Sequence, residues 1–172
     1  MIHIYYGDGK GKTTAAMGLA LRAAGAKQKV VVGQFLKNGT SSEVEALSQL
    51  SCVTYVKPQE FYGFTYAMTK EQKEKAAIYY KKYLDEIQEL GRREDTFLIV
   101  LDELLDVCNK DLLEEEAVRL FLTEMKEKEK EVVLTGRNPK EAFLKMADYV
   151  TQMQKEKHPY DRGIPARKGV EL

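Results

Sequence analysis

A glycine-rich loop with a lysine and two threonines is the first feature of this sequence that could do chemistry. It reads "YYGDGKGKTTAAMG" over residues 5–18, between the short apolar run 2–6 and a segment rich in good helix formers. Glycines let such a loop curl so that backbone N–H groups point at phosphate oxygens, and the following helix N-terminus adds its dipole. Lys12 would supply a positive charge to those oxygens, and Thr13 a hydroxyl to Mg²⁺. The spacing therefore predicts a phosphate-binding loop.

The spacing of this loop differs by one residue from the usual pattern. That pattern places a glycine five residues before Gly11, where this chain has Tyr6, and the first glycine is Gly7. The alternative interpretation is a glycine-rich turn that holds no ligand. We favour phosphate binding because Gly11, Lys12 and Thr13 stand between a predicted strand and a predicted helix.

Two acidic residues end the most apolar stretch of the chain. The run "FLIVLDE", 97–103, is typical of a buried strand, with Asp102 and Glu103 at its carboxyl end. An acid there holds magnesium in many nucleotide-binding enzymes. A strand that ends in an acid is common, so this segment indicates a magnesium site only in combination with the glycine loop. Arg137 ends another apolar run, 131–137, where it could contact phosphate or simply lie on the surface.

Strands and helices must alternate along the chain to bring these residues together. Six apolar runs have the length and composition of strands: 2–6, 29–36, 52–56, 96–103, 131–137 and 148–153. Five segments carry helix-forming signals, beginning near Lys12, Ser42, Thr69, Leu112 and Asn138. This alternation predicts an α/β fold with helices on both faces of a mostly parallel sheet. In such sheets ligands bind beyond the carboxyl ends of the strands.

Capping residues predict where three of these helices begin. Ser42 with Glu45, and Thr69 with Gln72, have the spacing of capping boxes. Asn138 precedes a proline, which suits a cap followed by the first helical position.

Length and charge set limits on the class of protein. The 172 residues suit one domain, 1–172, with an irregular tail from about residue 155. Lys plus Arg and Asp plus Glu both number 27, and a net charge of zero argues against nucleic acid as a partner. The sequence shows neither a membrane-spanning apolar run nor a signal-peptide pattern. We therefore expect no membrane partner and a cytoplasmic location.

The segment "FYGFTY", 61–66, is too aromatic for an ordinary loop. Phe61, Tyr62, Phe64 and Tyr66 lie between a predicted strand and a predicted helix. They could form a satellite core cluster or a platform for a large flat ligand, and the spacing does not separate the two.

Several segments together resemble one family, the P-loop class of corrinoid adenosyltransferases. The matching pieces run in the family's order from residue 7 to 171: "GDGKGKTTAAMGLALRAAG", "GQFLKNG", "GFTY", "VLDEL", "LTGR" and "ADYVTQM…KHPYDRGIPARKGVE". The G-x-G-K-G-K-T-T form of the loop is typical of that family, which accounts for its spacing. The resemblance implies a P-loop NTPase-like (RecA-like) three-layer fold with about six strands.

The resemblance also implies a reaction. Such enzymes transfer the 5′-deoxyadenosyl group of ATP to the Co(I) centre of a reduced corrinoid and release triphosphate, in adenosylcobalamin biosynthesis or salvage. They use ATP as co-substrate with Mg²⁺ (or Mn²⁺), they need an electron-donating reductase or flavin, and they are usually homodimers.

Site residues follow from the resemblance position by position. Thr13 and Glu103 would hold the metal, and Arg22 and Arg137 match arginines near the nucleotide. The residues that would cradle the triphosphate form one run: Gly7, Asp8, Gly9, Lys10, Gly11, Lys12, Thr13 and Thr14.

Two aromatic residues match a pair thought to displace the lower axial ligand of the corrinoid. They are Phe64 and Tyr66, although tryptophan is usual at the second position. With Lys12 and Glu103, they complete the set of catalytic candidates.

Two alternatives stay open at the level of sequence. The first is another P-loop enzyme, either a small kinase or a RecA-like ATPase. The second is a non-catalytic nucleotide-dependent module whose aromatic loop binds a protein. Formation of ADP would favour a kinase or ATPase, because an adenosyltransferase should not make it.

Overall fold

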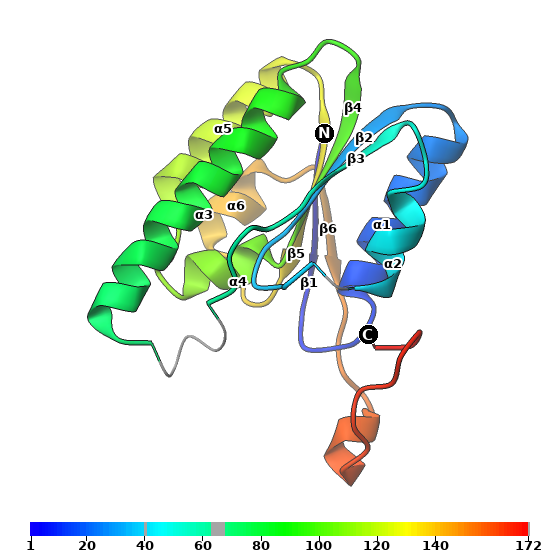
Figure 1. Cartoon of the computed structure of the whole chain (residues 1–172), viewed down its shortest axis with the longest axis vertical. Helices are drawn as coiled ribbons and strands as arrows, with labels where there is room; N and C mark the ends of the chain where they lie inside the picture. Colours follow the sequence, from blue (N-terminus) through cyan, green and yellow to red (C-terminus); the bar gives the residue numbers. More distant parts are fainter. Residues whose placement is uncertain (40, 63–67, 172) are drawn as a thin grey trace.

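Six parallel strands form one continuous sheet in the computed structural model, which describes residues 1–39, 41–62 and 68–171. The strands are β1 (Ile2–Tyr6), β2 (Lys29–Gln34), β3 (Val53–Val56), β4 (Thr96–Asp102), β5 (Glu131–Gly136) and β6 (Tyr149–Gln152). Their order across the sheet is β3-β2-β4-β5-β1-β6, and every neighbouring pair is parallel (Figure 1). The predicted α/β fold is confirmed, and the described sheet is parallel throughout.

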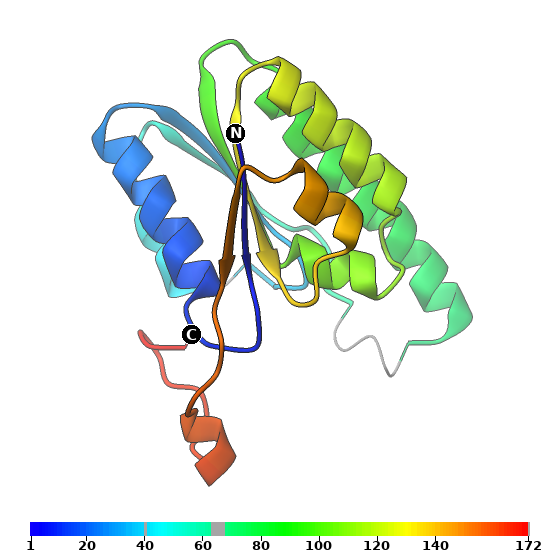
Figure 2. The ribbon, with the colours of Figure 1, turned by 180° about the vertical axis from the view of Figure 1, so that it is seen from behind.

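Helices cover both faces of the sheet and complete three layers. They are α1 (Lys12–Gly25), α2 (Ser42–Leu47), α3 (Lys70–Gly91), α4 (Leu104–Asn109), α5 (Glu115–Glu127) and α6 (Glu141–Met146). Figure 1 shows α1 and α2 on one side of the strands and α3 to α6 on the other, and Figure 2 shows the same division from behind. None of the helices in the described ranges is both long and apolar enough to cross a membrane.

The central strand β4 shows why its sequence lacks an alternating pattern. Successive side chains of a strand point to opposite faces of the sheet. Leu98 and Val100 accordingly pack into the core beside α1, whereas Ile99 and Leu101 pack into the core beside α3 and α5. A strand covered on both faces needs apolar residues at every position, so the run predicts a central strand.

One of the predicted capping boxes is present, and another is wrong by one residue. The Thr69 side chain accepts from the Gln72 backbone N–H, and the Gln72 side chain accepts from the Thr69 N–H, at the start of α3. Ser42 is instead the first residue of α2, after Ser41 at the N-cap, and that cap makes no side-chain hydrogen bond.

The predicted helix start at Asn138 is also wrong. The helix α6 begins at Glu141, with Lys140 as its N-cap. Asn138 has a left-handed φ of 43°. A proline disfavours right-handed helical geometry in the residue before it, so Asn138 turns the chain and the helix starts later.

The chain after β6 has little regular structure, as predicted. It contains the 3₁₀ turn Pro159–Arg162 and otherwise irregular backbone. Figure 1 shows this tail at the end of the sheet where the strands finish, with its last part returning toward the start of α1.

Candidate active site

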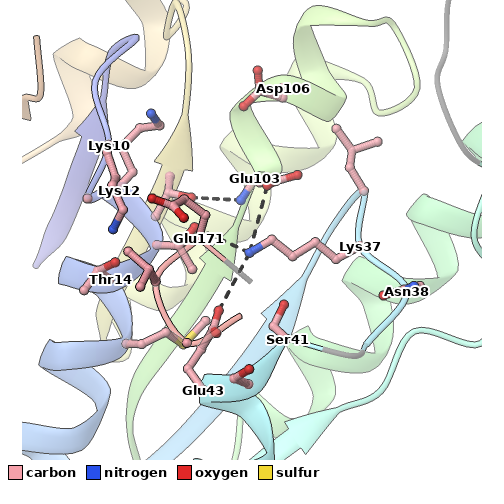
Figure 3. A pocket seen from close by; sticks show the side chains of 18 of the residues that line it. Lys10, Lys12, Thr14, Lys37, Asn38, Ser41, Glu43, Glu103, Asp106 and Glu171 are labelled. Carbon is pink, nitrogen blue, oxygen red and sulfur yellow. Dashed lines mark hydrogen bonds and ion pairs between the residues drawn. The ribbon is translucent and has the colours of Figure 1, made fainter. Parts of the chain in front are cut away.

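A cleft of about 1240 Å³ opens beyond the carboxyl ends of the strands. Its walls come from the glycine loop after β1, the segment after β2, the acids after β4, Arg137 after β5 and the tail residues 168–171. Figure 3 shows these side chains converging from separate elements. This is the edge at which ligands bind in parallel α/β sheets.

The glycine loop divides into two parts with different neighbours. The residues that line the cleft are Lys10, Gly11, Lys12, Thr13 and Thr14. The earlier residues of the loop, from Gly7 to Gly9, instead pack against the backbone just after β6. A Cβ on Gly7 would lie 2.3 Å from the carbonyl oxygen of Met153, and one on Gly9 would lie 2.7 Å from that oxygen and 2.8 Å from the Gln154 carbonyl carbon. These two glycines therefore allow close approach of another backbone segment.

Backbone hydrogen bonds hold the first part of the loop in place. The Gly9 N–H donates to the Met153 carbonyl at 2.8 Å, and the Gly7 N–H donates to the Gly136 carbonyl at 3.2 Å. Asp8 accepts from the Lys155 N–H at 3.0 Å, and this bond lowers the pKa of the Asp8 carboxyl. The loop is thus braced from β5 and from the chain beyond β6.

Lys12 stands at the start of α1 and carries its charge into the cleft. Its Nζ donates to the Gly9 carbonyl at 2.7 Å. Burial lowers the pKa of the Lys12 ammonium, and the positive charge of Arg137 lowers it further. A lysine ammonium that is disfavoured by burial and by a neighbouring guanidinium is stabilised when an anion binds beside it.

Asp102 is the centre of the polar network at the floor of the cleft. Its carboxylate is fully buried at the end of β4. Asp102 Oδ1 accepts from Thr13 Oγ1 at 2.9 Å and from Thr135 Oγ1 at 2.7 Å. Asp102 Oδ2 accepts from Lys37 Nζ at 2.8 Å and from Gln34 Nε2 at 3.2 Å. A buried carboxylate with four donors is fixed in position and orientation.

Glu103 directs a second carboxylate toward the cleft from the next position. Its backbone has a left-handed φ of 62°, and its N–H donates to Thr135 Oγ1 at 2.9 Å. Burial raises the pKa of the Glu103 carboxyl to about 7, with a further contribution from the charge of Asp102. Left-handed backbone in a residue other than glycine is strained and concentrates at functional sites.

The two predicted arginines have different positions. Arg137 lines the cleft, and its N–H donates to Asp106 Oδ2 at 3.2 Å. Gly136 before it has a φ of 147° and would place a Cβ 2.7 Å from that same oxygen, so glycine is required there. Arg22 is exposed near the end of α1, and the cleft-lining residues in the described part of the chain do not include it.

The predicted aromatic pair, Phe64 and Tyr66, lies outside the described residues. The residues just before it are placed. Phe61 lines the cleft, and the Tyr62 ring packs against Tyr79 and Tyr80 of α3 with centroids 5.8 and 6.3 Å away. Tyr62 is therefore anchored to α3.

Several residues in or just beneath the cleft do not appear among the sequence candidates. Gln34 and Lys37 complete the network around Asp102, and Glu171 reaches the cleft from the tail. Figure 3 shows Glu171 beside Lys10 and Lys12. A polar glutamine inside the apolar run of β2 is the signal that could have revealed the first two. Glu171 carries no comparable signal.

The oxygens around Thr13 suit a hard cation. The Thr13 hydroxyl and the Asp102 and Glu103 carboxylates face one place, and the Lys37 ammonium already lies among them. Among the described residues there is no group of three acidic, histidine or cysteine side chains that could form a metal cage. Mg²⁺ needs no such cage, since it binds through one or two protein oxygens, substrate phosphates and water.

Comparison with known proteins assigns the chain to a family. The family model described as "ATP:corrinoid adenosyltransferase BtuR/CobO/CobP" matches residues 1–172. A corrinoid adenosyltransferase of Sinorhizobium sp. is 34% identical, covering 100% of this chain and 80% of the relative. One from Pseudomonas aeruginosa is 35% identical, covering 98% and 82%.

A solved structure has the same fold. A KaiC-like protein of Pyrococcus horikoshii superposes with a TM-score of 0.55 at 16% identity, covering 91% of this chain and 74% of that one. This likeness shows a RecA-like α/β fold, whereas the matches in sequence show the family. The chain belongs to the ATP:corrinoid adenosyltransferases.

Proposed function

We propose that the cleft binds ATP and that the protein transfers its 5′-deoxyadenosyl group to the Co(I) centre of a reduced corrinoid. The observation that carries this function is the loop threonine, Thr13, hydrogen-bonded to the buried acid Asp102 in a chain that the family covers from residue 1 to 172. That contact builds a nucleotide site, and family membership specifies the chemistry performed there.

The reaction makes triphosphate the leaving group. The electron pair of Co(I) attacks C5′ of the ribose, a Co–C bond forms, and the C5′–O bond breaks with its electrons on the departing oxygen. The protein must therefore stabilise negative charge on the whole triphosphate. We assign this role to Lys12, Arg137 and the N–H groups at the start of α1, and the support is that all of them line the cleft.

We propose that Thr13 and Glu103 hold Mg²⁺ (or Mn²⁺), with Asp102 orienting Thr13 from behind. When bound, the ion would offset charge on the triphosphate. Glu103→Gln keeps the shape and removes the charge, so metal-dependent turnover should fall by about a hundredfold. Glu127→Gln, on the exposed face of α5, is the matched control. Unchanged turnover and unchanged Mn²⁺ affinity in Glu103→Gln would move the metal to Asp102.

The product distinguishes this function from its alternatives. Reduced cobalamin, ATP and the protein should give the spectrum of the adenosylated corrinoid, with triphosphate as the phosphate product on ion-exchange chromatography. Stoichiometric ADP and phosphate would indicate a kinase or an ATPase instead.

Phe64 and Tyr66 are proposed to displace the lower axial donor of the corrinoid. An axial donor makes Co(II) hard to reduce, and an aromatic ring offers no strong lone pair. Phe64→Ala should leave ATP binding intact and slow the reaction from Co(II), with a smaller defect when Co(I) is supplied chemically. Phe97→Ala, at the opposite end of β4, is the control. Tyr66→Trp should be neutral or improve the Co(II) reaction. Equal loss of ATP and corrinoid binding in Phe64→Ala would assign these rings to packing.

We further propose that the protein is a cytoplasmic homodimer that receives electrons for cobalt from a reductase or a reduced flavin. Family membership is the support for these three points. Light scattering during size-exclusion chromatography would measure the oligomeric state. Reduced flavin alone, without added chemical reductant, should support turnover.

A further inference from the structure

Lys37 places a positive charge where the proposed metal would lie. Its Nζ is 2.8 Å from Asp102 Oδ2 and 3.5 Å from Thr13 Oγ1. Two further carboxylates face it, Glu43 at 3.9 Å and Glu103 at 4.0 Å (Figure 3). We propose that Lys37 is a built-in cation that occupies this acid cluster until a divalent metal arrives together with the triphosphate. The metal and the ammonium then exchange places.

This inference rests on the proposed metal at Thr13 and Glu103, because the ammonium and that metal would crowd one another. A magnesium ion bonds to oxygen at about 2.1 Å, so an ion on Thr13 Oγ1 would lie within about 5.6 Å of Lys37 Nζ in its present position. Repulsion between two cations is strong at such a distance in a partly buried site, where water screens poorly. The metal can bind well only if the ammonium leaves.

The network around Asp102 allows the ammonium to leave without stranding a buried charge. Thr13 and Thr135 still donate to Asp102 Oδ1, and Gln34 still donates to Oδ2. Each carboxylate oxygen therefore keeps a hydrogen bond. Lysine is a point charge on a flexible stem, and the side chain of Lys37 is 20% exposed at the cleft.

The backbone before Lys37 limits this exchange to a side-chain movement. Phe35 is fully buried, and its N–H donates to the Asp102 carbonyl at 2.8 Å. Leu36 has a left-handed φ of 54°, which directs the chain at this point. The Cα of Lys37 is thus held near the acid cluster while its long side chain can turn into the cleft.

The position that the Lys37 ammonium takes after its displacement links metal binding to nucleotide binding. Without triphosphate, a metal that displaced Lys37 would leave the ammonium facing Lys10 and Lys12 across the cleft with no new anion. With triphosphate, the displaced ammonium would meet phosphate oxygens. Each ligand therefore raises the affinity for the other, as any coupling between two sites requires.

Removal of the Lys37 charge tests the exchange directly. Lys37→Gln keeps a donor for Asp102 and loses the charge, and Lys82→Gln on the exposed face of α3 is the matched control. Mn²⁺ binding is measured by electron paramagnetic resonance, with and without inorganic triphosphate. We expect Lys37→Gln to bind Mn²⁺ alone at least about tenfold more tightly than wild type, within the usual range of site coupling. The gain in Mn²⁺ affinity from triphosphate should shrink by a similar factor.

Equal Mn²⁺ affinity of Lys37→Gln and wild type without triphosphate would overturn the exchange. A second measurement uses the wild-type protein, so it does not depend on how the variant folds. The Nζ resonance of Lys37 in ¹⁵N-lysine-labelled protein should stay in place with Mg²⁺ alone and shift with Mg²⁺ plus triphosphate. An Nζ resonance that responds identically to both would also overturn it. If wild type binds no Mn²⁺ even with triphosphate, the proposed metal site itself fails, which is a separate result.

Discussion

The two walls of the cleft are built in opposite ways. The inner wall rests on Gln34, Asp102 and Thr135, whose side chains come from three strand ends and whose hydrogen bonds link residues far apart in sequence. The outer wall is the tail segment 167–171. Its hydrogen bonds join residues within four positions, mainly Arg167 and Glu171.

This difference separates a fixed surface from an adjustable one. The inner wall cannot rearrange without breaking buried hydrogen bonds to several elements, so it holds Asp102 in the same position for every ligand, while the Lys37 side chain in front of it can move. The outer wall can open at the cost of local, exposed contacts, which have the low local stability typical of ligand-binding segments. A cleft that is proposed to bind ATP and a large corrinoid would use both the fixed surface and the adjustable one.

The largest expected effect comes from breaking the inner wall at its centre. Asp102→Asn would replace one acceptor oxygen by an amide donor that faces either the Lys37 and Gln34 donors or the two threonine hydroxyls, and it would leave the ammonium without its closest anion. We expect a loss of about 1.5 to 3 kcal/mol in the free energy of unfolding, as for the loss of hydrogen bonds to a charged group. Adenosyl transfer should fall by about a hundredfold. Urea unfolding and a transfer assay measure the two effects.

Asp95→Asn, in the exposed turn before β4, provides the control and should change neither quantity. If Asp102→Asn were as stable and as active as this control, the inner wall would not be the fixed surface that the comparison requires.

A smaller loss of stability and of ATP binding is expected from a substitution at the contact between the glycine loop and the chain beyond β6. Gly9→Ala would drive a Cβ into the backbone of Met153 and Gln154, which cannot yield as a side-chain tip can. We expect a loss of about 1 to 3 kcal/mol in stability, together with weaker ATP binding, by calorimetry.

Gly18→Ala is the matched control within α1, because a Cβ at Gly18 meets nothing within 4 Å. It should stabilise the protein by up to about 1 kcal/mol, as alanine does in a helix interior. Destabilisation of similar size by both substitutions would mean that the brace at Met153 has no special role.

The outer wall should affect binding more than stability. Glu171 places a carboxylate in the cleft that would face the triphosphate, so Glu171→Gln should tighten ATP binding two- to threefold, roughly the size of an exposed charge interaction. The midpoint of urea unfolding should stay unchanged. Weaker ATP binding in this variant would show that Glu171 helps to hold the nucleotide.

The smallest expected effect is the dependence of tail stability on pH. The Arg167 guanidinium lowers the pKa of the Glu171 carboxyl to about 2, from an ordinary value of 4.5. A depressed carboxyl pKa stabilises the folded tail fully above the ordinary value, and this contribution disappears as the pH falls toward 2. An NMR titration of Glu171 should give a midpoint well below 4, and Arg167→Ala should raise it toward the ordinary value, with the backbone N–H of residue 167 still lowering it in part.

The sequence predicts the inner frame of the site better than its surroundings. Apolar runs locate all six strands, but the physical reason differs: strands covered on both faces, such as β4, need apolar residues, whereas the edge strand β6 is exposed along its length. Once the strands are parallel, Lys12, Asp102 and Arg137 must share one rim. The loop glycines are also predicted, but only the packing at Met153 shows that two of them serve a backbone contact.

Local signals fail where long-range contacts decide the structure. Leu112 and Leu113 suit the start of a helix, yet both are buried in the core before α5, which begins at Glu115. The short helix α4 after Glu103 follows from the left-handed turn there and has no sequence signal of its own. Lys37 belongs to the site through its distance to Asp102, which no spacing along the chain expresses.

The brace of the glycine loop has a consequence for synthesis of the protein. Gly9 is made 144 positions before Met153, its hydrogen-bond partner. At typical elongation rates the loop waits about 7 to 30 s for this partner. For most of that interval β1 also lacks both β5 and β6 as neighbours. A nascent chain should therefore gain ATP affinity only after Met153 has been made and can reach Gly9.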